Sequence, residues 1–307
     1  MADIDHTKYS FASNGDTASE IPSSSLSFLS EYKGEKDLTK LRGTLTDMWT
    51  ESKSKYHVYK CIQTFAFLHP RIALHPFYPT IVSALQGSNS GNHAIPTSKR
   101  VIDIGCCYGT DVRRMLHDGV PTSRIVASDL HSGYWDLGKK LFNDEERISS
   151  VETVFANWAV TKTDAPEREE NPKAIDMKKY KNSALFIVAT AVLHVFSKSQ
   201  CETFLSNVYE ALAHGGTFIG TCVGRRMEGV WLQRLEQDNS APATAEEEAR
   251  SRYLHSQESL KKAMETLGFT SVRVDLHPRD PQLYNNENDG KVQPEGTLFF
   301  RFQASKA

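Results

Sequence analysis

Val101-Ile-Asp-Ile-Gly-Cys-Cys-Tyr-Gly109, followed by Thr110 to Leu116, is the stretch that decides the fold of this 307-residue chain. Its first four residues are β-forming and mostly apolar, which predicts a buried strand. A turn bounded by Gly105 and Gly109 comes next, and apolar residues then recur at helical spacing from Val112 onward. The stretch therefore predicts a strand, a tight turn and a helix N-terminus, whose free amides are suited to binding a ligand.

The spacing of the glycines limits what the turn can bind. A dinucleotide fingerprint requires G-x-G-x-x-G, whereas three residues separate Gly105 from Gly109, with Cys107 at the middle position. No Gly-Lys-Ser/Thr follows, so the turn is not a P-loop either. For this segment alone, an ordinary glycine-containing turn without a ligand is the alternative.

A carboxylate on the next predicted strand points to a nucleoside. Arg124 to Asp129 reads as a strand, and Asp129 ends it about 20 residues beyond the glycines, where an acid can accept hydrogen bonds from both ribose hydroxyls. The glycine turn and this acid in register are more specific than either feature alone. Together they predict a cofactor that contains a nucleoside.

The run Asp103 to Gly109 resembles motif I of the class I S-adenosylmethionine (SAM) methyltransferases, with Cys107 in place of the central glycine. Longer stretches are similar to fungal secondary-metabolite methyltransferases, notably those of meroterpenoid pathways that esterify a carboxyl group. Those stretches are Tyr59 to Arg71, Asp103 to Arg113 and Gly133 to Phe142. The doubled cysteine is typical of that group, and the similarity spans about residues 55–302.

This resemblance implies S-adenosyl-L-methionine as the cofactor, with no metal. Motif I would wrap the methionine part, and Asp129 with its neighbour Leu130 would meet the ribose. Asn157 stands where family members usually carry an acid near the adenine, and a turn-forming Asn is the alternative. The predicted cofactor-binding residues are Asp103, Gly105, Cys107, Gly109, Asp129, Leu130, Asn157 and Trp158.

Candidate substrate residues follow the predicted central strands. The apolar run Ala184 to Ala189 indicates a strand buried on both faces, and ligands of open α/β sheets bind beyond the strand carboxyl ends. His194 is therefore expected in the crevice, to orient a carboxylate or act as a base, unless it is simply packed in place. Arg225 and Arg226 follow the next strand as candidates for binding an acid, or as solvated surface residues, and Tyr59 is a further substrate candidate.

The order of strands and helices indicates one α/β domain. The resemblance implies a seven-stranded, doubly wound Rossmann-like sheet with an N-terminal helical cap. Residues 1–35 are expected to be a flexible N-terminus, 36–95 the cap and 96–307 the α/β core, with 237–252 a surface insertion. The periodicity predicts cap helices that include 56–67, and we expect the cap to pack over the strand carboxyl ends because it has no second core.

Composition restricts the partners. The net charge is -2, with both signs interspersed, so no field recruits nucleic acid or an anionic membrane, and a small-molecule substrate is expected. No apolar run reaches the ~20 residues needed to cross a bilayer. Five cysteines without a C-x-x-C pair favour a reducing, cytoplasmic location. A homodimer is a possible assembly.

The predicted activity is SAM-dependent O-methylation, giving the methyl ester of a terpenoid or polyketide-derived acid. A carboxylate is already ionised near neutral pH, whereas a phenol with a pKa of about 10 benefits from a general base, and no Asp-His pair is evident. The alternatives are methylation of a phenol or hydroxyl, and a SAM-binding protein without transfer. An NAD-dependent enzyme is disfavoured by the glycine spacing.

Overall fold

The computed structural model describes residues 21, 23–56, 59–86, 100–161, 173–231, 252–277 and 297–307. In these ranges a seven-stranded sheet has the order β3-β2-β1-β4-β5-β9-β8, and β6 pairs with β7 in a small second sheet. The strands are β1 (Val101–Ile104), β2 (Ile125–Asp129), β3 (Glu152–Phe155), β4 (Ala184–Thr190), β5 (Leu212–Arg225), β6 (Gly229–Trp231), β7 (Arg252–Leu254), β8 (Phe269–Leu276) and β9 (Thr297–Lys306).

Strands β1 to β5 pair in parallel, and β9 runs antiparallel between β5 and β8. This confirms the predicted seven-stranded, doubly wound sheet, which ends in an antiparallel hairpin of β8 and β9. The helices are η3 (Ser23–Leu26), α1 (Ser27–Lys33), α2 (Leu38–Lys55), α3 (Lys60–Gln63), η4 (Ala66–Leu68), η5 (Arg71–Leu74), α4 (Tyr78–Gln86), α5 (Thr110–His117), η6 (Thr122–Arg124), α6 (Ser132–Phe142), α7 (Met177–Tyr180), η7 (Leu193–Val195), α8 (Lys198–Ala211) and α10 (Gln257–Thr266).

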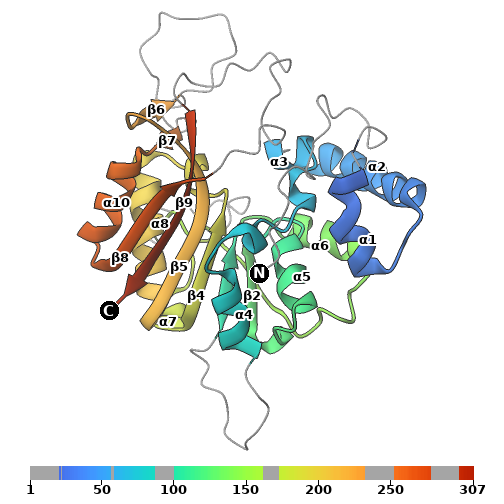
Figure 1. The fold of residues 1–307 in the computed structure, drawn as a ribbon, viewed down its shortest axis with the longest axis horizontal. Coiled ribbons are helices and arrows are strands. Elements are labelled where there is room, and N and C mark those ends of the chain that lie inside the picture. The colour runs from blue at the N-terminus through green and yellow to red at the C-terminus, as the bar shows by residue number, and fades with distance from the viewer. Residues whose placement is uncertain are drawn as a thin grey trace, which may run out of the picture.

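Helices cover both faces of the sheet (Figure 1). Residues of α4, α5 and α6 share one apolar cluster with Val101 of β1, and residues of α8 and α10 share another with Ile102. Neighbouring residues of a strand point to opposite faces, so β1 contributes to both clusters. The same holds for β4, where Phe186 and Ile187 enter different clusters. Burial on both faces is the reason that β4 reads as a continuous apolar run.

A third apolar cluster joins the N-terminal helices to α6. It contains Phe28 of α1, Leu41 and Leu45 of α2, and Leu141 and Phe142 of α6. In Figure 1, α1 and α2 lie beside α5 and α6, at the end of the sheet away from β8. The segment expected to be flexible thus includes a helix, α1, whose apolar side chains are buried here. Residues 1–20 and 22 lie outside the described residues.

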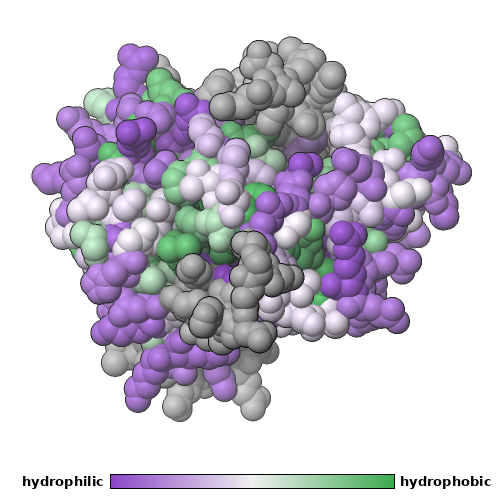
Figure 2. Space-filling model, turned by 60° about the horizontal axis from the view of Figure 1, so that its bottom comes forward, coloured by the Kyte–Doolittle hydropathy of each residue, from purple (hydrophilic) through white to green (hydrophobic). Residues whose placement is uncertain are grey.

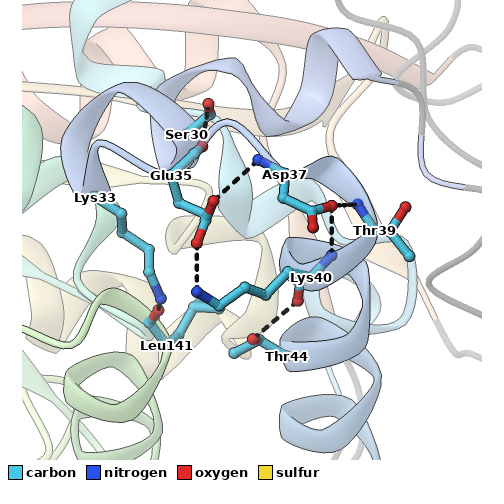
Figure 3. A network of polar contacts seen from close by, with 8 residues as sticks. All are labelled: Ser30, Lys33, Glu35, Asp37, Thr39, Lys40, Thr44 and Leu141. Carbon is cyan, nitrogen blue, oxygen red and sulfur yellow. Dashed lines mark hydrogen bonds and ion pairs between the residues drawn. The ribbon is translucent and has the colours of Figure 1, made fainter.

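Polar contacts fix the junction between α1 and α2 (Figure 3). Asp37 caps α2, because its carboxylate accepts the backbone N–H groups of Thr39 and Lys40 at 2.9 and 3.2 Å. Lys33 Nζ donates to the carbonyl of Leu141 at the end of α6. The junction is therefore tied to the helix that packs against the glycine turn.

The helix expected over residues 56–67 is interrupted. Of the described residues, Lys60–Gln63 form α3, and the chain then passes through Phe65 at φ +55° into η4. Phe67 stacks on Tyr108 of the glycine turn with 4.2 Å between ring centroids. Tertiary packing of these aromatic rings replaces a continuous helix. The next turn, η5, is held by the Ile72 N–H, which donates to Asp111 Oδ1 at 3.1 Å.

The small sheet was not expected. β7 starts at Arg252, and its Tyr253 N–H donates to the carbonyl of Phe196 at 2.7 Å, which places β7 beside η7. The rest of the stretch expected to be an insertion, residues 237–251, lies outside the described residues.

The face in Figure 2 carries hydrophilic side chains around its rim, with apolar side chains gathered nearer the middle.

Candidate active site

The glycine turn between β1 and α5 has the backbone that its sequence predicts. Gly105 and Gly109 adopt left-handed conformations at φ +78° and +72°, which favour glycine. Cys107 adopts the same region at φ +51°, so it supplies the conformation of the missing central glycine at a steric cost. The Cys107 N–H donates to Asp129 Oδ2 at 2.8 Å and thereby joins the turn to the end of β2.

Close packing leaves no room for side chains at the two glycines. A Cβ at Gly105 would lie 2.5 Å from Val192 Cγ2, in the loop that follows β4. A Cβ at Gly109 would lie 2.5 Å from the Trp135 ring and 2.6 Å from Arg113 Nη1. The turn is thus enclosed by the loop after β4 on one side and by α6 on the other.

Arg113 is hydrogen-bonded to the backbone of the turn. Its side chain is fully buried, and its Nη1 donates to the carbonyls of Tyr108 and Gly109 at 2.7 and 3.2 Å. Nε and Nη2 form a bidentate ion pair with Asp144, at 2.7 and 2.8 Å. A bidentate pair fixes direction as well as distance, so it holds the carbonyl groups of the turn in one orientation.

Three acids gather behind the turn. Asp103, Asp111 and Asp129 are all buried. Burial and the charges of Asp111 and Asp129 raise the pKa of Asp103 well above its usual range, and Asp103 Oδ2 has no hydrogen-bond partner. Burial likewise raises the pKa values of Asp111 and Asp129. A positively charged ligand would stabilise these carboxylates in the ionised form.

The site fits the methionine and ribose parts of SAM. The unpartnered Asp103 oxygen matches an ammonium group, and the glycine turn brings the backbone close to a ligand. Asp129 accepts the N–H groups of Cys107 and His131, at 2.8 and 3.1 Å, and each carboxylate oxygen keeps a lone pair for a ribose hydroxyl. Leu130 follows directly and is half-buried.

Asn157 and Trp158, both predicted to bind the cofactor, have hydrogen-bond partners within the protein. Asn157 Oδ1 accepts the N–H of Ala159 at 2.8 Å, which is the local pattern of a turn-forming Asn. Trp158 is buried in the core, where its Nε1 donates to Ser128 Oγ at 2.8 Å. The Trp158 side chain therefore lies in the core, hydrogen-bonded to the residue before Asp129.

His194 lies in η7, just past β4. Its Nδ1 accepts the backbone N–H of Val223 at 3.3 Å. Burial, with the positive charges of Arg252 and Arg71, lowers the pKa of His194 to about 3. The ring is therefore neutral near pH 7, and because Nδ1 accepts a hydrogen bond, its proton is on Nε2. His194 is a hydrogen-bond donor at Nε2 and a weak base.

The charged residues around His194 are not the arginines selected from sequence. Arg252 in β7 and Arg71 in η5 both act on its pKa. The Tyr59 hydroxyl lies within electrostatic reach of Arg252 and Asp129, with burial raising its pKa to about 12. Arg225 lies at the end of β5, where its N–H donates to the carbonyl of His255, and Arg226 is exposed.

Three of the six non-glycine residues that have a positive φ in the described part of the chain belong to this region. Besides Cys107 and Phe65, Ala191 at the end of β4 has φ +60°, and its N–H donates to the Thr221 carbonyl at 2.8 Å. Such strained residues are typical of functional sites. In the part of the chain that the structure describes, no group of His, Cys, Asp and Glu side chains is arranged to hold a metal ion.

Comparison with known proteins identifies relatives, although no family profile matches the chain. It is 38% identical over 93 residues to O-methyltransferase atr3 of Stereocaulon alpinum, covering 30% of this chain and 24% of atr3. Over 239 residues it is 28% identical to O-methyltransferase phiE of Fungal sp., covering 76% of this chain and 69% of phiE. The chain is a relative of fungal methyltransferases.

That relationship confirms the resemblance inferred from the glycine turn. A third relative is the Asnovolin E/Chermesin D methyltransferase nvfJ of Aspergillus novofumigatus, 34% identical over 92 residues and 30% of each chain. The alignments with atr3 and nvfJ thus span less than a third of those relatives. A solved geranyl diphosphate methyltransferase in complex with SAM matches 80% of this chain and 88% of its own, with 10% identity and a TM-score of 0.48.

Among the helices that the structure describes, none combines the length and the apolar character that a bilayer span requires.

Proposed function

We propose that this chain is a SAM-dependent O-methyltransferase of fungal secondary metabolism that esterifies a carboxyl group of a small terpenoid or polyketide-derived acid. The relationship to fungal methyltransferases supports methyl transfer, and the glycine turn with its three acids supports SAM as the cofactor. Within this class of enzyme, the sequence resemblance further favours a carboxylate as the acceptor and a meroterpenoid-type pathway.

The observation that carries the choice of acceptor is the hydrogen bonding of His194. Its Nδ1 is occupied by the Val223 N–H, and its pKa of about 3 is far below that of a useful base at neutral pH. A phenol or alcohol acceptor would benefit from such a base. A carboxylate needs only a donor to orient it, and the Nε2–H of His194 is such a donor.

The cofactor, when bound, supplies a methyl group on a sulfonium, and transfer of that methyl to a carboxylate gives an ester and releases no proton. Asp129 would hold the ribose, and Asp103 would lie opposite the ammonium group. The residues around the turn and η7 would align the two reactants and exclude water, which are the main requirements of such a displacement.

The proposal is tested with SAM that carries tritium in its methyl group. Purified protein is incubated with this SAM and with farnesoic, abietic or salicylic acid, each paired with its primary alcohol. We expect transfer to an acid, and mild base should then release the label as volatile methanol, as from a methyl ester. Base-stable label on salicylic acid or an alcohol would mark an ether and support the hydroxyl alternative. SAM binding without transfer to any compound would support a protein without this activity.

A further inference from the structure

Positive charge that the sequence did not reveal acts on His194. Three elements meet beyond the carboxyl end of β4: η7 with His194, β7 with Arg252, and η5 with Arg71. The 2.7 Å hydrogen bond from Tyr253 to Phe196 holds β7 against η7. The position of η5 is fixed through Asp111, which accepts the Ile72 N–H at 3.1 Å and the Thr190 hydroxyl at 2.9 Å.

We propose that the guanidinium of Arg252 and the Nε2–H of His194 together bind the carboxylate of the acceptor, with Arg71 adding positive charge to the same site. This inference rests on the proposed function and names the residues that select an acid. Guanidinium is suited to the task because its parallel N–H groups match the two oxygens of a carboxylate.

The surroundings of Arg252 support this role. Burial lowers its pKa, so its charge is partly removed from water and favours an anion close by. The Tyr59 hydroxyl lies within electrostatic reach of both Arg252 and Asp129. Tyr59 thus links Arg252 to the end of β2, where the ribose would lie. A carboxylate between Arg252 and His194 would thus lie close to the cofactor.

Arg71 differs from Arg252 in its neighbours. Its charge acts on the Asp111 carboxylate as well as on His194. The residue after Arg252 is hydrogen-bonded to Phe196, two residues past His194, whereas η5 is held through Asp111, so we assign Arg252 the direct contact and Arg71 a supporting effect. The substitution that tests the proposal is therefore made at Arg252.

The test measures binding, so it does not depend on turnover. Calorimetry on the complex with S-adenosylhomocysteine compares abietic, farnesoic and salicylic acids with their primary amides. The variants are Arg252→Met, which keeps the unbranched stem, and Arg252→Lys, which keeps the charge without the paired N–H groups. Arg273→Met, at an exposed position of β8, is the matched control.

We expect the parent protein to bind at least one acid about 10- to 100-fold more tightly than its amide, the range for hydrogen bonds to a charged group. Arg252→Met should abolish that preference, Arg252→Lys should keep part of it, and Arg273→Met should keep all of it. Unchanged binding of S-adenosylhomocysteine shows that the variants are folded.

Two results would overturn the proposal: no preference for an acid in the parent protein, or a preference that Arg252→Met leaves intact. Loss of the preference in Arg226→Met instead would assign the contact to the sequence candidate. These failures are distinct from failure of the proposed function. Ester formation with a preference unaffected by Arg252→Met would refute only the carboxylate contact, and an intact, Arg252-dependent preference without ester formation would refute only the reaction.

Discussion

The buried ion pair between Arg113 and Asp144, next to the glycine turn, should contribute several kcal/mol to the free energy of unfolding. Asp144→Asn keeps the shape of the side chain but removes the charge opposite Arg113. Arg113 is fully buried and the Asp144 side chain is 4% exposed, so water cannot replace the lost partner. Breaking such a pair costs about 3–5 kcal/mol, because a buried charge is left uncompensated. Two charge-assisted hydrogen bonds at about 1.5–3 kcal/mol each give a similar sum.

Urea unfolding followed by tryptophan fluorescence measures the change in the free energy of unfolding. Asp136→Asn is the control, because Asp136 pairs with Lys139 on the surface and its side chain is 56% exposed. A pair of that kind contributes about 0–1 kcal/mol. A loss below about 1 kcal/mol for Asp144→Asn, or equal losses for the two variants, would refute the view that this pair supports the turn.

Four further substitutions, at three positions, test the cofactor site and its connection to η5. Asp129→Ala should weaken SAM binding by about 1.5–3 kcal/mol in calorimetry, as loss of hydrogen bonds to a charged group implies, and unchanged affinity would remove Asp129 from the site. Gly105→Ala should reduce SAM binding and Gly105→Val should reduce it more, because a Cβ there approaches Val192 to 2.5 Å at a positive φ; wild-type affinity in both would contradict the geometry. Asp111→Ala should lower the free energy of unfolding by about 1–3 kcal/mol, since the Ile72 N–H and the Thr190 hydroxyl lose their acceptor, and an unchanged urea midpoint would count against that contact.

The sheet and the glycine turn could be predicted because their signals are local. A strand, two glycines and a carboxylate on the next strand specify Gly105, Gly109 and Asp129 without any distant contact. One topological rule, that ligands bind beyond the strand carboxyl ends, selected His194 as a candidate, and its place in a ligand crevice stays a prediction. These features depend on residues close together in the chain, or on strand order alone.

The residues around His194 could not be predicted in the same way. Arg252 begins a three-residue strand after a polar stretch, and its neighbour η7 is more than fifty residues earlier in the chain. Arg71 follows a His-Pro pair in a short turn, where no periodicity distinguishes it. The Asp144 partner of Arg113 is 31 residues away. All three depend on tertiary packing.

Packing also changed one local prediction. The periodic segment 56–67 has the apolar pattern of a helix, yet stacking of Phe67 on Tyr108 accompanies a left-handed Phe65 that ends α3. Here an aromatic side chain gains more by entering the core than local sequence can indicate. The contact of Trp158 with the cofactor stays a prediction, and its indole is buried against Ser128.

The central claim is that His194 orients a carboxylate and does not act as a base, and a pH profile tests it most directly. With saturating SAM and an acid that the protein esterifies, kcat is measured from pH 6 to 8 for the parent and for His194→Gln. The His194 pKa of about 3 and a carboxyl pKa near 4 both lie below this window, so kcat should stay nearly constant. His194→Gln should raise KM and leave kcat within about threefold, since an amide N–H still donates. A kcat that rises with pH and falls about 100-fold or more in His194→Gln would show that His194 is a general base, and would contradict the account.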